Sequence, residues 1–117
     1  MINEEYLSKC TDEQINLAVA WIKARKTTMI PYSFTLFQQF DSKPAFCSHY
    51  YHPTSNYNEC MPLAIECGMT IEFPHKDLGE IGTISVYIEG NTDISFDFDN
   101  NDNHLRIICE AYILSNI

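Results

Sequence analysis

Apolar residues recur at helical spacing in three stretches of the chain. The first stretch begins after Thr11, which forms a capping-box pattern with Gln14, and its helix is expected to end near residues 26–28. The second begins near Ser55 or Asn56, and Gly68 follows it as a C-terminal cap. Because proline is tolerated mainly in a first turn, Pro62 predicts that this regular helix starts near residues 60–61.

The third helical stretch runs from residue 104 to residue 117, after a turn and cap region at 100–103. Each of the three helices carries a stripe of residues expected to face the core. These are Ile15, Ala18, Val19 and Ile22 in the first, Cys60, Leu63, Ala64 and Cys67 in the second, and Leu105, Ile108, Cys109, Tyr112 and Ile113 in the third.

Alternating apolar and polar residues predict strands at 69–73, 83–88 and 93–99, and a further strand within 30–37. In the last of the three, Ile94, Phe96 and Phe98 share one face and the acidic residues share the other. This one-sided polarity indicates an antiparallel sheet with one solvated face. The longest loop-like stretch, 38–54, contains the run His49-Tyr50-Tyr51-His52.

The predicted order is α-β-α-β-β-β-α. It corresponds to an α+β fold in which three helices accompany an antiparallel sheet of three to four strands. The length of 117 residues and the hydrophobic content of 45% fit a single domain over residues 1–117. The start of the chain lacks the basic and apolar regions of a signal peptide, and the apolar runs are shorter than the roughly 20 residues of a membrane span. We therefore expect a cytoplasmic protein without a membrane partner.

Charge is distributed unevenly along the chain. Residues 1–43 contain five acidic and five basic residues, whereas residues 44–117 contain eleven acidic residues against Lys76 and Arg106. The second part therefore carries the entire net charge of −9. Such a field repels nucleic acid and attracts basic protein surfaces, so a protein partner is expected and direct nucleic-acid binding is not.

Several acidic residues fall on the predicted strands and their turns. Carboxylates spaced about 6–7 Å apart along one strand face could imitate backbone phosphates and dock on a basic groove. The other interpretation is an ordinary solvated sheet face. The candidate partner-binding residues are Glu72, Glu89, Asp93, Asp97, Asp99 and Asp102, together with Tyr50 and Tyr51 of the aromatic loop.

No motif specifies a metal or cofactor site, and none is expected. The run 97–102 starts like a calcium loop, but Asp102 stands where glycine is needed and Ile108 where the closing glutamate is needed. The cysteines and histidines at 47–52 lack the paired spacing of zinc knuckles. The five cysteines are expected to be reduced core thiols.

Three segments together resemble the NinX-like family of small phage and prophage proteins. These are Thr11–Ala20, the stretch Tyr57–Glu66 with Gly68–Ile71 after it, and Asn103–Leu114. The likeness covers roughly half of the chain and shows no match over 29–50. His104 stands where the family usually has proline, and Asn58 where an aromatic residue is common. The resemblance implies a phage origin and a small accessory role in a bacterial cell, with no established enzymatic activity.

Charge and resemblance together predict a non-enzymatic protein that inhibits a nucleic-acid-handling host defence protein, of the anti-CRISPR or anti-restriction type, through its acidic surface. One alternative is a homo-oligomeric structural or regulatory module in which the aromatic loop Phe46–Tyr57 mediates self-association. A further alternative is a small cysteine-dependent enzyme that uses Cys47 or Cys60 with His49 or His52.

Overall fold

The fold combines four helices with a three-stranded antiparallel sheet, which confirms the predicted α+β class. The computed structural model describes residues 2–27, 51–75, 81–87 and 94–116. The elements, in chain order, are α1 (Glu4–Ser8), α2 (Asp12–Thr27), α3 (Tyr57–Cys67), β1 (Thr70–Glu72), β2 (Gly82–Val86), β3 (Ile94–Phe98) and α4 (His104–Ser115). The predicted strand within 30–37 and most of the loop 38–54 lie outside the described residues.

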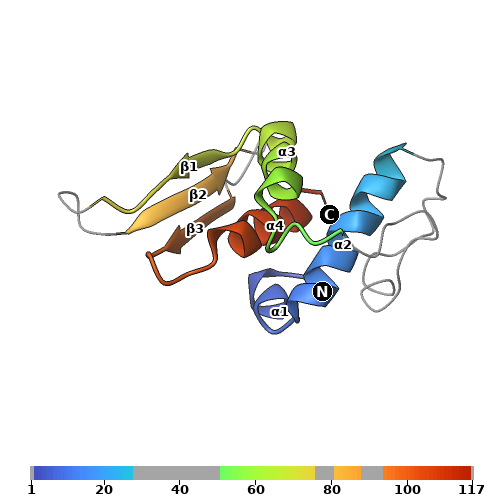
Figure 1. Ribbon diagram of the computed structural model, residues 1–117, viewed down its shortest axis with the longest axis horizontal. Coiled ribbons are helices and arrows are strands. Elements are labelled where there is room, and N and C mark those ends of the chain that lie inside the picture. The colour runs from blue at the N-terminus through green and yellow to red at the C-terminus, as the bar shows by residue number, and fades with distance from the viewer. Residues whose placement is uncertain (1, 28–50, 76–80, 88–93, 117) are drawn as a thin grey trace.

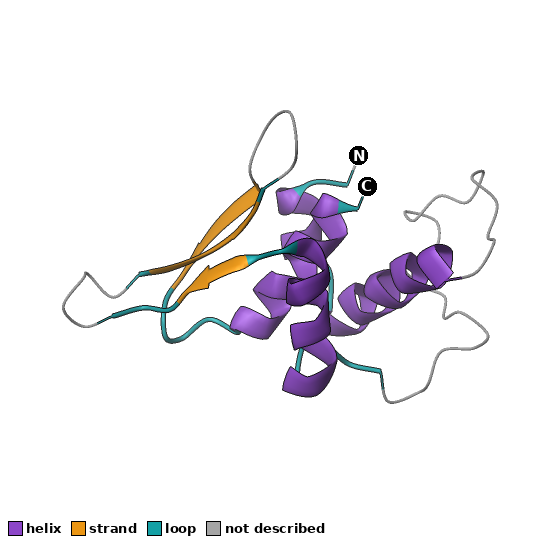
Figure 2. Ribbon diagram, turned by 90° about the horizontal axis from the view of Figure 1, so that it is seen from above, coloured by secondary structure: helices purple, strands orange, loops and turns teal. Residues whose placement is uncertain are grey.

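Helix α4 lies at the centre of the molecule and touches most of the other elements. It packs against α1, α2 and α3 as well as against β2 and β3 (Figure 1). Seen from above, the helices gather on one side while the sheet extends to the other (Figure 2). Of the core stripe predicted for α4, Ile108, Cys109, Tyr112 and Ile113 are fully buried, whereas Leu105 is partly buried and packs against the core.

Helix α2 begins where the capping box predicts. The Thr11 amide donates to Gln14 Oε1 at 2.9 Å, and the Gln14 amide donates to Thr11 Oγ1 at 3.1 Å. These reciprocal bonds satisfy two amides that the first turn of a helix leaves unpaired. The predicted core stripe Ile15, Ala18, Val19 and Ile22 is completely buried.

Helix α3 starts earlier than Pro62 predicts. Asn56 caps it by accepting the Glu59 amide at 3.2 Å, so regular helix begins at Tyr57 and Pro62 lies inside it. The missing Pro62 amide would have paired with the Asn58 carbonyl four residues before it. Asn58 is exposed, so water can satisfy that carbonyl. Gly68 ends the helix in the left-handed conformation at φ +64°, as predicted.

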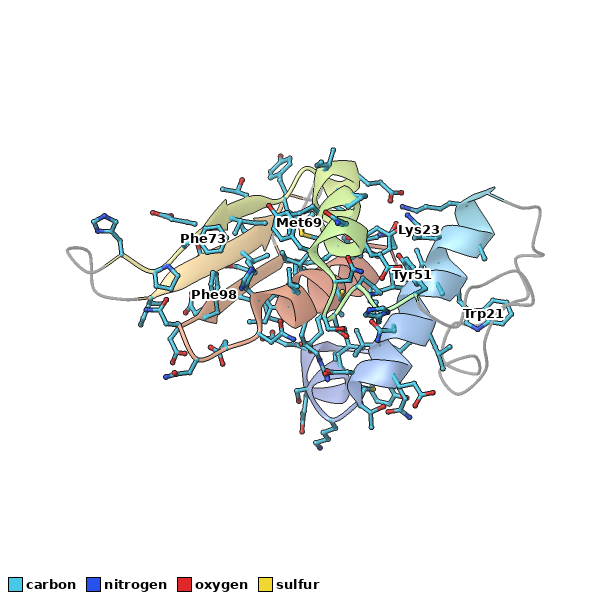
Figure 3. The ribbon with its side chains drawn as sticks, viewed as in Figure 1. Trp21, Lys23, Tyr51, Met69, Phe73 and Phe98 are labelled. Carbon is cyan, nitrogen blue, oxygen red and sulfur yellow. The ribbon has the colours of Figure 1, made fainter. Side chains whose placement is uncertain are left out.

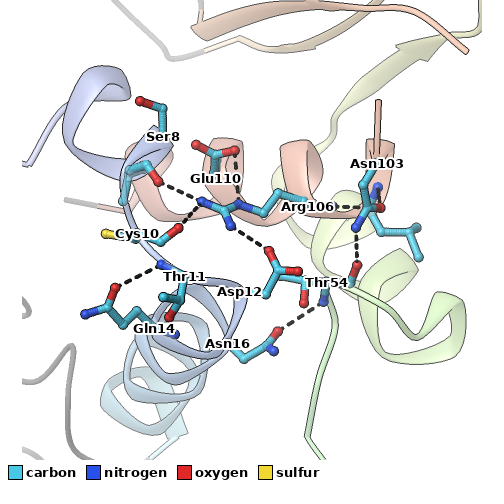
Figure 4. Close-up of polar contacts among 12 residues, drawn as sticks. Ser8, Cys10, Thr11, Asp12, Gln14, Asn16, Thr54, Asn103, Arg106 and Glu110 are labelled. Atoms are coloured by element: carbon cyan, nitrogen blue, oxygen red, sulfur yellow. Dashed lines mark hydrogen bonds and ion pairs between the residues drawn. The ribbon is translucent and has the colours of Figure 1, made fainter. Parts of the chain in front are cut away.

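The short helix α1 is absent from the predicted order. It has only five residues and buries only Leu7, so it presents no apolar periodicity. Its start is fixed by Asn3, whose side chain accepts the Tyr6 amide at 2.8 Å. Tertiary contacts hold its end, because Arg106 of α4 donates to the Leu7 carbonyl at 2.8 Å and to the Cys10 carbonyl at 2.7 Å (Figure 4).

A second polar network ties the segment before α3 to both long helices. The Thr54 amide donates to Asn16 Oδ1 of α2 at 3.1 Å, and the Thr54 carbonyl accepts from Asn103 Nδ2 at 2.8 Å (Figure 4). Asn103 also caps α4 by accepting the amides of Leu105 and Arg106. Since Thr54 is 1% exposed, these bonds satisfy backbone groups that water does not reach.

The sheet has the order β1-β2-β3 and a regular antiparallel register. Ile84 lies opposite Ile71 on one side and Phe96 on the other, and this row faces the core. At the far end of β2, Gly82 lies opposite Phe98. A Cβ at Gly82 would overlap the Glu72 carbonyl oxygen and lie 2.8 Å from both Phe98 and Pro74, so only glycine fits between the neighbouring strands.

Candidate functional site

The solvent-facing side of the sheet is the candidate site, and its composition follows from the strand register. Residues paired across antiparallel strands point to the same face. One row across the three strands is Glu72–Thr83–Asp97, and the next row is Thr70–Ser85–Ser95. We call these six residues the acidic sheet face. It carries only hydroxyl and carboxylate groups, which confirms that one side of the sheet is polar.

The two carboxylates of this face lie on different strands. Glu72 on β1 and Asp97 on β3 are separated by Thr83 on the central strand. Two strand spacings correspond to about 10 Å between their Cα atoms. Within β3 the same-face neighbour of Asp97 is Ser95, and Asp99 follows two residues later in the turn; Asp93, also expected on this strand, lies outside the described residues. The acidic sheet face therefore carries two carboxylates in one row, with Thr83 between them.

Asp99 and Asp102 form the turn that leads from β3 to α4. The Asp99 amide donates to Asp102 Oδ2 at 2.9 Å, and the Asn101 amide donates to Asp99 Oδ1 at 2.7 Å. Each carboxylate thus satisfies a backbone group of the turn, and both residues remain exposed. They add charge beside the sheet, but they also have a local structural role that Glu72 and Asp97 do not share.

Glu72, Asp97, Asp99 and Asp102 form no ion pair with any residue that the structure describes, whereas most other described acidic residues do. Elsewhere, Lys9 lies 3.3 Å from Glu5 and Lys26 lies 2.7 Å from Glu66. Arg106 contacts both Asp12 and Glu110. The charges on and beside the sheet are therefore not neutralised by described neighbours, and their field extends into solvent.

The remaining sequence candidates are not part of this face as described. Glu89, Asp93 and Tyr50 lie outside the described residues. Tyr51 is half-buried, packs against the core and lies between α3 and α2, away from the sheet (Figure 3). The structure thus brings Glu72, Asp97, Asp99 and Asp102 to one region and places Tyr51 in another.

Two large exposed side chains flank the acidic face and were not among the sequence candidates. Ile81 and Tyr87 lie directly before and after β2 and are 63% and 75% exposed. Their signal in the sequence was the alternation of residues 81, 83, 85 and 87, which places them on the same side as Thr83 and Ser85. A partner on this face would meet apolar surface at both ends of a polar centre, as in many interfaces.

The end of the sheet beside α4 carries an aromatic cluster on the opposite side. The Phe73 ring lies 6.0 Å from the Phe98 ring in edge-to-face geometry (Figure 3). It also lies edge-to-face with the His104 ring at 5.3 Å, and Phe98 and His104 stack. Phe98 lies opposite Gly82, and its ring covers the position that a side chain at Gly82 would occupy, a pairing that compensates for a glycine within a strand. We assign this cluster a structural role.

Cys60, the described thiol proposed for a cysteine-dependent enzyme, lies in the core. It has no exposed surface and lies 3.5 Å from the Leu105 carbonyl, to which it donates. It also hydrogen-bonds Cys109, and this bond, together with burial, raises the pKa of the Cys109 thiol well above its usual range. His52 instead lies beside Glu59, with Nδ1 3.7 Å from Oε1. Cys47 and His49 lie outside the described residues.

A metal site is not formed by the residues that the structure describes. They contain no group of three or more His, Cys, Asp or Glu side chains arranged to hold a metal ion. A surface depression of about 530 Å³ is lined by Asn3, Glu4, Glu5 and Ser8. These four described lining residues all belong to α1 or its cap.

Comparison with protein-family models, curated proteins and solved structures gave no match to this chain. The resemblance to NinX-like phage proteins therefore stays a prediction from the sequence. Among the helices that the structure describes, none has the length and apolar character required to span a bilayer.

Proposed function

We propose that this protein is a non-enzymatic binding protein that docks on a basic protein surface through its acidic sheet face and the turn 99–102. The main support for this proposal is that four acidic residues around one sheet are exposed and have no cationic partner among the described residues. These are Glu72, Asp97, Asp99 and Asp102. A partner with lysines or arginines would neutralise these charges and associate faster at low salt.

The proposed partner class is a nucleic-acid-handling protein of a bacterial host, with inhibition by occlusion of its basic groove. Two features support this class: the sequence resemblance to small phage proteins, and the net charge of −9, which disfavours direct contact with nucleic acid. Glu72 and Asp97 would contact the groove, while Ile81 and Tyr87 would supply apolar contact at its sides.

The test is a pull-down from nuclease-treated bacterial lysate with three tagged proteins. These are the wild type, the double variant Glu72→Lys/Asp97→Lys, and a matched control, Glu4→Lys/Glu13→Lys, with the same charge change on exposed helical positions. Glu72 and Asp97 are chosen over Asp99 because the Asp99 carboxylate supports its turn. Circular dichroism verifies that each variant folds.

We expect the wild type and the control to retain the same nucleic-acid-binding protein, released as the salt concentration rises, and the sheet variant to lose it. Equal retention by the sheet variant would contradict the proposal. Recovery of the tagged protein alone would favour the homo-oligomer alternative, which sedimentation at two concentrations would then measure directly.

A further inference from the structure

Strand β3 forms an edge of the described sheet. It pairs with β2 over all five of its residues, and within the described residues it has no strand on its other side. In an antiparallel ladder, successive residues direct their amide and carbonyl groups alternately to the two sides. About half of the β3 backbone groups therefore point away from β2 and can pair with a further strand.

The side chains of β3 define what such a strand would have to offer. Phe96 and Phe98 face the core and α4, whereas Ser95 and Asp97 are exposed on the opposite face. An added strand would present alternate residues to these two environments. Directly beside Asp97, a lysine or arginine would form a favourable cross-strand pair, and an acidic residue would be repelled.

A second copy of this chain is a poor occupant of that edge. It would bring another net charge of −9 and the same acidic strand alongside Asp97. Charged residues on edge strands generally prevent such self-pairing. Charge complementarity instead selects a basic segment from a different protein.

We infer that an extended basic segment of the partner pairs with β3 as an additional strand of the sheet. This inference rests on the proposed function, since the same partner would contact the acidic sheet face. It adds main-chain hydrogen bonds to the electrostatic attraction, and these bonds would fix the orientation of the partner.

Hydrogen exchange of the free protein provides the first test. We expect the amides of residues 94–98 to alternate between slow exchange, where they pair with β2, and fast exchange, where they face outward. Uniformly slow exchange of all five amides would mean that the edge is already paired, and it would overturn the inference.

A peptide titration followed by amide chemical shifts provides the second test. The probe is a peptide of about nine residues in which lysine alternates with valine. The control is the same peptide N-methylated at three consecutive central residues, which keeps its charge but removes backbone donors on both edges. We expect the probe to slow hydrogen exchange of the outward-facing β3 amides and to bind at least about tenfold more tightly than the methylated control. We also expect the substitution Asp97→Lys to lower the affinity for the probe about tenfold.

The outcomes separate the two proposals. If the methylated peptide binds as tightly as the probe, strand addition is wrong, while charge-driven docking on the sheet face stands. If the probe does not bind at all, strand addition is also wrong, and the lysate experiment with Glu72→Lys/Asp97→Lys decides the proposed function independently.

Discussion

Arg106 of α4 donates to Asp12 at the start of α2, with Nη1 2.5 Å from Oδ1, although 94 residues separate them in the chain. The same guanidinium donates to the Leu7 and Cys10 carbonyls, and its Nε lies 3.5 Å from Glu110 Oε2. The side chain is 17% exposed, so these partners replace most of its water. One planar group with several fixed donors thus joins α1, α2 and α4.

Replacing Arg106 is expected to destabilise the fold strongly. Arg106→Ala leaves two carbonyls and the buried Glu110 without their donor and should lower the free energy of unfolding by about 3 kcal/mol. Arg106→Lys keeps the charge but cannot reach all four partners, so an intermediate loss is expected. Urea denaturation measures both. A loss below about 0.5 kcal/mol for the alanine variant, the range of ordinary surface substitutions, would show that the cluster is not structural.

Gly82→Ala tests the close packing of the sheet. Its new methyl group would overlap the Glu72 carbonyl oxygen and the Phe98 ring, so β1 and β3 must shift, at a cost of about 1–3 kcal/mol. The matched control is Gly68→Ala, where nothing lies within 4 Å and only the positive φ opposes the substitution, at about 1 kcal/mol. Thermal denaturation compares them. A Gly82→Ala protein as stable as the wild type would mean that β1 and β3 can move apart without a measurable loss of stability.

Glu66 is expected to contribute stability that is lost in acid. Burial raises the pKa of its carboxyl, but hydrogen bonds from Lys26 and Tyr112 and the charges of Lys26 and Lys23 outweigh burial and lower this pKa below its ordinary value of 4.5. The contribution is therefore full above about pH 4.5 and disappears as the pH falls through the folded-state pKa. The stability difference between wild type and Glu66→Gln should be largest near neutral pH and narrow in acid. A difference in the free energy of unfolding that stays the same at every pH would contradict this prediction.

Glu110 should show the opposite dependence on pH. Burial raises the pKa of this carboxyl even though Arg106 acts to lower it. The protonated form of Glu110 therefore contributes to the free energy of unfolding, and this contribution is fully present when the pH lies below the usual pKa of a carboxyl group. It is lost as the pH rises through the raised pKa of the folded state and Glu110 ionises. Relative to Glu110→Gln, the wild type should gain stability as the pH is lowered from neutral. Chemical denaturation at several pH values measures the free energy of unfolding of both proteins. A wild type that loses stability relative to Glu110→Gln as the pH is lowered would refute the prediction.

The described thiols are expected to differ in reactivity. Cys60 and Cys109 are fully buried, so reagent cannot reach either sulfur, and the bond between them together with burial raises the pKa of Cys109, which also disfavours its thiolate. Cys10 and Cys67 are half-buried and should react first with iodoacetamide. Peptide-resolved mass spectrometry follows the labelling rates, with the urea-unfolded protein as the control. Rapid labelling of Cys60 in the folded protein would instead support the cysteine-dependent enzyme.

Local patterns were sufficient where neighbouring residues decide the conformation. The Thr11–Gln14 capping box and the Gly68 cap were both predicted, because each depends on hydrogen bonds within one turn. Pro62 misled the prediction of where α3 begins. Its cost is a single missing hydrogen bond to the carbonyl of Asn58, an exposed residue, and the Asn56 cap and packing on α4 outweigh this cost.

The candidate site was predictable only in part. Alternation placed Asp97 on the polar face of its strand, but it did not give the strand order that brings Glu72 into the same row through Thr83. The same alternation runs through Ile81 and Tyr87, but it did not show that these side chains lie beside the acids of the neighbouring strands. Which acids share a row depends on register, which is set by pairing between distant segments.

By itself, the sequence determined the α+β class, the core stripes, the helix caps and the acidic character of one sheet face, because periodicity and capping are short-range properties. Only the tertiary structure decided that α1 forms, that Arg106 joins three helices and that β3 lies at an edge of the sheet formed by the described residues. Each of these depends on contacts between residues far apart in the chain, and no local pattern encodes which distant partner closes such a contact.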